Sequence, residues 1–179
     1  LDESSVGFIT TRGSPTGNLD NSVAGLDFLY RNTRLPAGRA LETDVWYQQS
    51  DTEGIVGDDA AYGMSVRLPS SQGFRSTLQY RAYEENFQPA LGFINRQGIS
   101  DTYLNLGYML RKSSGYLESW LFNFDYQRIE NIRGGLQTEA YFFRPFTFAN
   151  RTGDTIMLAI SDFTEVLDAP FQIYPGIVV

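Results

Sequence analysis

The sequence predicts an all-β fold: an antiparallel up-and-down meander that forms part of a transmembrane β-barrel. Two observations predict it. Apolar and polar residues alternate in segment after segment, and short connections ending in glycine take turns with long ones. Helical periodicity is hard to find, whereas Thr, Tyr and Phe, which favour strands, are frequent. We treat residues 1–179 as a single β-barrel domain, or a fragment of a larger one, with about nine to ten strands.

Eight segments show this alternation, although the last two are less regular. Most are close to the ~9–11 residues that a tilted strand needs to cross a membrane. The end of the chain, FQIYPGIVV, resembles the start of another strand, so we expect the chain to be a piece of something longer. In chain order the eight segments are 21–30, 39–49, 59–68, 74–83, 102–111, 115–128, 136–144 and 154–163.

The connections indicate which ends of the strands lie together. In a meander, strict alternation of short and long connections puts every short turn at one end and every long loop at the other. Outer-membrane barrels show this asymmetry, with short periplasmic turns and longer external loops. A soluble β-sandwich also has alternating strands, so it stays open as the alternative fold. The short turns are 35–38, 69–73, 111–115 and 149–153, and the long connections are 12–20, 50–59, 84–98, 127–135 and 163–172.

In a barrel, the polar side of each strand would face the lumen and tune which solutes pass. Glu42 and Asp44 share one side of their strand, and we expect them to lie among the arginines of the next two strands. A charge-compensated barrel interior explains such a set better than a pair of catalytic carboxylates does. The residues predicted to face the lumen are Glu42, Asp44, Arg67, Arg75, Gln79 and Arg81.

The connection 84–98 (EENFQPALGFINRQG) is unusually apolar for a solvated loop. Four large apolar residues make full exposure to water unfavourable: Phe87, Leu91, Phe93 and Ile94. We expect the loop to pack its apolar groups against the mouth of the barrel and the neighbouring loops. The alternative is a loop that folds inward as a plug or forms an apolar lip for a ligand.

Composition excludes several functions. The net charge is −7 and only 14 residues are Lys or Arg, without clustering, so we expect no nucleic-acid partner. The chain has no cysteine and no histidine, which removes thiol catalysis, disulfides and histidine-based triads. We therefore predict no enzyme activity, no cofactor and no dedicated metal site. Whether the acidic segment from Asp51 to Asp59 binds calcium stays open, because its spacing does not match an EF-hand.

Two stretches carry a family resemblance: NFQPALGFINR at 86–96, and FTEVLDAPFQIYPG at 163–176. From about Ser22 onward the chain resembles the C-terminal β-barrel domain, itself of unknown function, of a family of Gram-negative outer-membrane proteins. The resemblance implies an outer-membrane location, lipid as a partner and an association with glycans. It also implies a carbohydrate-binding module of the family-9 type before the barrel in the full-length protein. It implies no catalytic residue.

These expectations combine into one functional prediction. The chain belongs to an outer-membrane barrel with a non-enzymatic surface role, such as glycan-related anchoring or passage. The alternative is a secreted, soluble β-sandwich that binds carbohydrate through exposed aromatic residues such as Trp46 and Tyr126. What contacts the apolar side of the strands distinguishes the two: lipid in the first case, a second layer of protein in the second.

Overall fold

The computed structural model describes residues 3–14, 20–167, 172–174 and 177–178. The described residues contain eleven strands, one 3-10 turn at Pro36–Gly38 and no α-helix. The strands are β1 (Ser5–Arg12), β2 (Asn21–Leu35), β3 (Arg39–Thr52), β4 (Ala60–Leu68), β5 (Gly73–Tyr83), β6 (Ile99–Arg111), β7 (Leu117–Asn131), β8 (Leu136–Asn150), β9 (Thr155–Glu165), β10 (Gln172–Tyr174) and β11 (Ile177–Val178).

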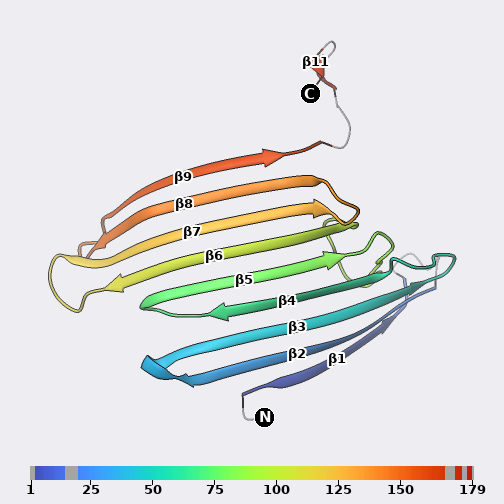
Figure 1. Cartoon of the computed structure of the whole chain (residues 1–179), viewed down its shortest axis with the longest axis horizontal. Helices are drawn as coiled ribbons and strands as arrows, with labels where there is room; N and C mark the ends of the chain where they lie inside the picture. Colours follow the sequence, from blue (N-terminus) through green and yellow to red (C-terminus); the bar gives the residue numbers. More distant parts are fainter. Residues whose placement is uncertain (1–2, 15–19, 168–171, 175–176, 179) are drawn as a thin grey trace.

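Nine of these strands form one open antiparallel sheet in chain order, from β1 at one edge to β9 at the other. Figure 1 shows the sheet as a single curved layer whose strands run up and down. The predicted all-β, up-and-down meander is therefore confirmed. Strand β1 lies before the first alternating segment of the sequence, and β10 pairs only with β11.

Alternation along the strands separates two faces of the sheet. Residues directly opposite each other on successive strands form a register row, and all residues of one row lie on the same face of the sheet. Val45 of β3 lies opposite Met64 of β4, and Asp44 lies opposite Ser65. We call the face that carries Phe28, Val45, Met64, Leu78 and Ile160 the apolar face. The opposite face, which carries Asp44, Ser65, Gln79 and Tyr103, is the polar face.

One predicted connection differs in the structure. Segment 127–135 is expected to be a long loop, but β7 continues to Asn131 and β8 begins at Leu136, which leaves a four-residue turn. The ladder continues because Gln127 pairs with Ala140 and Ile129 with Thr138 on both sides of this turn. Regular alternation of long and short connections therefore fails at this hairpin. The longest described connection is the β5–β6 loop, residues 84–98.

A single sheet has little interior, so the buried apolar residues gather where the β5–β6 loop folds back onto the strands. Val23 of β2, Ala61 of β4 and Phe87 of the loop form the buried cluster. Trp46, Tyr83 and Ile94 pack around it. Val23, Trp46, Ala61 and Tyr83 all lie on the polar face, because Trp46 pairs with Gly63 and Ala61 pairs with Tyr83.

Candidate functional site

The six residues predicted to face a lumen all lie on the polar face. Glu42 is in register with Arg67, and Gln79 is in register with Ser65, which itself lies opposite Asp44. Arg81 pairs with Gly63 in the same set of rows. Arg75 is on the same side of β5, because side chains two residues apart along a strand point the same way. The period-two alternation of the sequence therefore correctly placed these six residues on one face of the sheet.

Arg67 is the centre of the first charge cluster on this face. Its Nη2 lies 3.0 Å from Asp44 Oδ1, and its Nε lies 3.7 Å from Glu42 Oε2. Ser65 donates a short hydrogen bond to the same Asp44 oxygen. Arg67 thus contacts both carboxylates, and Arg31 Nε also lies 3.3 Å from Glu42 Oε1, so arginines compensate their charge without arranging them as an acid–base pair.

The other two arginines have different partners from those expected. Arg81 Nη2 lies 2.6 Å from Asp101 Oδ2 on β6, and Asp101 is buried. Arg75 Nη2 donates a 3.4 Å hydrogen bond to Asn123 Oδ1 of β7. The expectation that Glu42 and Asp44 lie among all three arginines is therefore correct for Arg67 and wrong for Arg75 and Arg81. The order of the strands explains these partners. Strand β5 lies between β4 and β6, and its two arginines extend towards β6 and β7 instead of towards β3.

A second polar cluster, centred on Asp125, was not singled out from the sequence. Asp125 Oδ1 accepts hydrogen bonds of 2.7 Å from both Tyr103 Oη and Asn105 Nδ2. Arg144 Nη2 lies 3.5 Å from Asp125 Oδ2, and Asn123 is almost fully buried beside it. The shared parity of Tyr103 and Asn105 along β6 was the available signal, since residues two apart face the same side.

The β5–β6 loop docks on the polar face through Phe87, whose side chain is only 1% exposed. Hydrogen bonds hold the main chain around it: Ser50 Oγ accepts from Gln88 N, and Asn21 Nδ2 donates to Gln88 O at 2.9 Å. Gln97 Nε2 donates to Phe87 O at 2.6 Å. The apolar side chains of the loop thus pack against the strand ends, while Asn86 joins the loop to the neighbouring β3–β4 loop through hydrogen bonds of 2.7 Å to Gly57 O and Asp58 O.

The four apolar loop residues have different environments. Phe87 is buried and Ile94 packs against its cluster, whereas Leu91 is 56% and Phe93 is 86% exposed. A cavity of about 720 Å³ lies between the exposed pair and the strands. Its lining includes Asp27, Asp44, Trp46 and Arg67 from the polar face.

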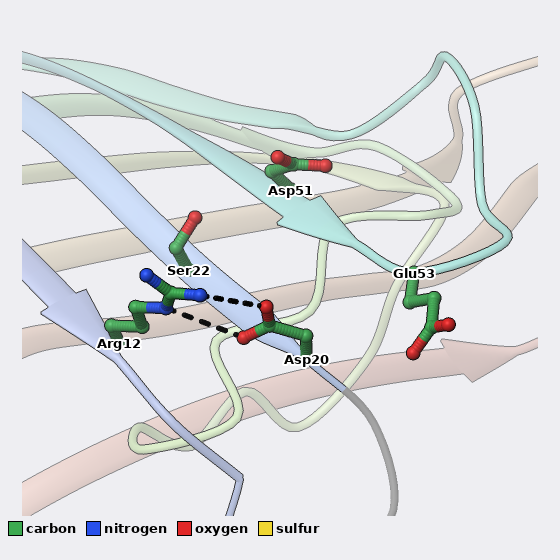
Figure 2. Close-up of a pocket in the computed structure, with 5 residues that line it drawn as sticks. All are labelled: Arg12, Asp20, Ser22, Asp51 and Glu53. Carbon is green, nitrogen blue, oxygen red and sulfur yellow. Dashed lines mark hydrogen bonds and ion pairs between the residues drawn. The ribbon is translucent and has the colours of Figure 1, made fainter.

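A smaller, acidic cavity of about 500 Å³ opens at the loop end of β1–β3 (Figure 2), lined by Arg12, Asp20, Ser22, Asp51 and Glu53. Arg12 Nη2 donates to Asp20 Oδ2 at 2.9 Å, and this hydrogen bond together with the guanidinium charge lowers the pKa of Asp20. Within the described ranges, no three potential metal-ligating side chains come together. Asp59 instead accepts a hydrogen bond from Gln49 Nε2.

The two aromatic residues named for a sugar-binding sandwich lie on opposite faces. Trp46 is on the polar face, 6.1 Å from the Tyr83 ring. Tyr126 is on the apolar face, where its ring lies 4.9 Å from Tyr141 and its hydroxyl donates to Glu139. They cannot contribute to one carbohydrate platform, because the sheet separates them.

Comparison with protein-family models, curated proteins and solved structures finds no match for this chain. In the part of the chain that the structure describes, no helix has the length and hydropathy of a membrane span.

Proposed function

We propose that this chain forms part of an outer-membrane β-barrel whose polar face lines a solute pathway, with a non-enzymatic role. The observation that carries the proposal is the apolar face. It runs from β1 to β9, and it exposes large side chains on every strand of the sheet except β7, whose apolar side chains on this face are half-buried. Examples along the sheet are Phe8, Leu26, Val45, Met64, Leu78, Tyr108 and Ile160. A water-soluble protein rarely exposes so extended an apolar surface.

The exposed apolar side chains of this face form a band, which we call the apolar band. It crosses the strands diagonally, as is expected when strands are tilted relative to the membrane normal. Phe28 of β2 is in the same register row as Thr164 of β9, through six intervening strands. On β9, however, the band comprises Ile156, Leu158 and Ile160, so its centre lies six residues (164 − 158) from Thr164. Phe28 lies well inside the band on β2.

This offset corresponds to a strand tilt. Six residues at ~3.3 Å per residue are about 20 Å, and seven strand spacings of ~4.8 Å are about 34 Å, which gives a tilt of about 30°. Strands of membrane barrels tilt by ~35–45°, so the two values are similar. In a sandwich, the band would instead have to match a second sheet.

The distribution of charge also supports an apolar face towards lipid and a polar face towards the lumen. The charged clusters of Arg67, Arg81 and Asp125 all lie on the polar face. On the apolar face, the described charges in the rows of Phe28 and Tyr30 lie towards the loop end of the later strands: Arg128, Glu139 and Asp162. Their place outside the band is the place expected for the membrane surface.

A closed barrel needs strands beyond these nine. Strands β1 and β9 run in the same direction and each has one unpaired edge within the described sheet. Bacterial single-chain barrels have even numbers of antiparallel strands, so we include further strands of a longer chain in the proposal. Glycans as solutes, and a carbohydrate-binding module before the barrel, rest on the family resemblance alone.

The test is fractionation of the full-length protein from native cells, followed by electrophoresis of the detergent extract with and without boiling. We expect extraction to require detergent and the band to shift on heating. Two matched variants sharpen the test: Leu78→Arg on the apolar face and Thr77→Arg on the polar face. A charge at the bilayer midplane costs about 2–4 kcal/mol, so only Leu78→Arg should reduce the heat-shifting form.

A protein that remains in solution without detergent would contradict the proposal and favour the soluble sandwich. Equal loss of the heat-shifting form in both arginine variants would also contradict it, because the two faces would then be equivalent.

A further inference from the structure

The cavity beneath the β5–β6 loop has one apolar end and one acidic end, and we propose that it binds a small amphiphilic amine. The apolar body of the ligand would lie under the loop against Trp46, and its ammonium group would meet Asp27. The inference goes beyond passage through a barrel. It stands on this cavity alone and holds whether or not the apolar face contacts lipid.

Glycines create the space for this cavity. In one register row of the polar face, Asp27 lies between Gly7 and Trp46, and Trp46 lies between Asp27 and Gly63. The Asp27 carboxylate covers Gly7, and the Trp46 indole covers Gly63, because a Cβ on either glycine would clash with those groups. The two side chains therefore lean away from each other and leave a gap over β2 and β3.

Asp27 supplies the charge at one end. It is exposed, and no hydrogen bond or ion pair engages it within the described part of the chain. The other charged residues lining the cavity are Asp44 and Arg67, which pair with each other at 3.0 Å. Arg67 also lies 3.7 Å from Glu42. The only cation of the lining is thus already held by two carboxylates, and the remaining charge is negative.

Aromatic groups supply the other end. Trp46, Tyr83 and Phe87 form a chain of ring contacts, with centroid distances of 6.1 Å and 6.5 Å. Leu91 and Phe93 overhang the cavity from the loop and are largely exposed, although hydrogen bonds fix the same loop at Phe87 and Gln88. A ligand body beneath them would cover this apolar area.

A carboxylate on one side of the gap and an indole on the other suit an amphiphilic amine. The carboxylate attracts the ammonium group, and the indole offers the ligand body an apolar surface whose electron-rich face is also compatible with a nearby cation. An anionic ligand of the same size would find Arg67 occupied and Asp27 repulsive. Charge complementarity therefore selects an amine over a carboxylate.

The experiment compares 2-phenylethylammonium with 3-phenylpropionate on the purified full-length chain. Trp120 lies on the apolar face, so the Trp120→Phe background leaves Trp46 as the only tryptophan of this region. We expect a saturable change in Trp46 fluorescence with the amine. The carboxylate should bind at least about tenfold more weakly, because the charge of Asp27 attracts the amine and repels the carboxylate.

Asp27→Asn keeps the shape of the side chain and removes its charge. It should weaken amine binding by about tenfold and abolish the preference over the carboxylate. Asp162→Asn, an exposed carboxylate on the apolar face of β9, is the matched control and should leave the affinity unchanged. Equal affinity for the two probes, an unchanged Asp27→Asn variant or the lack of saturable binding would each overturn the proposal.

Discussion

Single residues set the surface of the polar face, and the glycines within strands are the most informative of them. The mid-strand glycines on this face are each covered by a side chain from a neighbouring strand. Asp27 covers Gly7, Gln48 covers Gly25, Trp46 covers Gly63 and Arg75 covers Gly107. A strand residue without Cβ lets the side chain of its neighbour lie flat across the strand.

Replacing one such glycine should move one identified side chain. In Gly63→Ala, the new Cβ would lie 2.8 Å from three atoms of the Trp46 indole, which must shift. We expect a cost of about 1–3 kcal/mol, as for other overpacked sites, and a change in Trp46 fluorescence in the Trp120→Phe background.

Gly107→Ala is the control for that substitution. Its Cβ would meet Arg75 Nε at 2.8 Å and would not touch Trp46. Trp46 emission should therefore stay unchanged in this variant. Equal fluorescence changes in both alanine variants would mean that the sheet distorts as a whole, contrary to the local account.

At the scale of elements, the β5–β6 loop behaves as a docked segment of the sheet. One buried ring and main-chain hydrogen bonds to Asn21 and Ser50 dock it on the strands, and Gln97 of the loop itself donates to Phe87 O. The tip with Leu91 and Phe93 carries no comparable burial. Anchoring and tip are thus separate parts of one loop and can be tested separately.

Phe87→Ala should release this loop, whereas Phe93→Ala should not. Removing a buried phenylalanine ring costs about 3–5 kcal/mol, and here the loss falls on docking of the loop. We expect Phe87→Ala to make the loop sensitive to trypsin at Arg96 under conditions in which the parent chain is resistant. Phe93, at 86% exposure, loses little packing on truncation. Similar cleavage of both variants would show that Phe87 does not anchor the loop.

At the scale of the whole molecule, the open sheet presents one continuous apolar surface and one charged surface. Their separation needs nine strands in register, and the diagonal course of the apolar band needs the offset between β2 and β9. In the proposed barrel this offset defines the membrane plane. Residues in one register row then lie at different depths.

Depth can be measured because the chain has no cysteine. Single variants Phe28→Cys, Leu158→Cys and Thr164→Cys would each carry one fluorophore, read with quenchers placed in the lipid tails. We expect strong quenching at Phe28 and Leu158 and weak quenching at Thr164, although Thr164 shares a register row with Phe28. Equal quenching at Phe28 and Thr164 would contradict the tilt.

Much of the fold could be predicted because a strand has period two. Parity alone placed Glu42, Asp44, Arg67, Arg75, Gln79 and Arg81 on one face. Loop lengths were less predictable: segment 127–135 is polar and contains two glycines, yet the ladder of β7 and β8 continues through most of it. The composition of a segment does not show whether it still pairs with a neighbouring strand, so it could not show that this segment is mostly strand.

The sequence by itself determined the all-β class, the meander and the division of side chains between two faces, because these depend on period and on turn residues. Only the tertiary structure decided the partners across strands. Arg67 pairs with Asp44 while Arg81 pairs with Asp101, and Phe87 reaches Val23 and Ala61 from a distant loop. Register and the leaning of side chains over glycines set these contacts, and both arise only when the strands assemble.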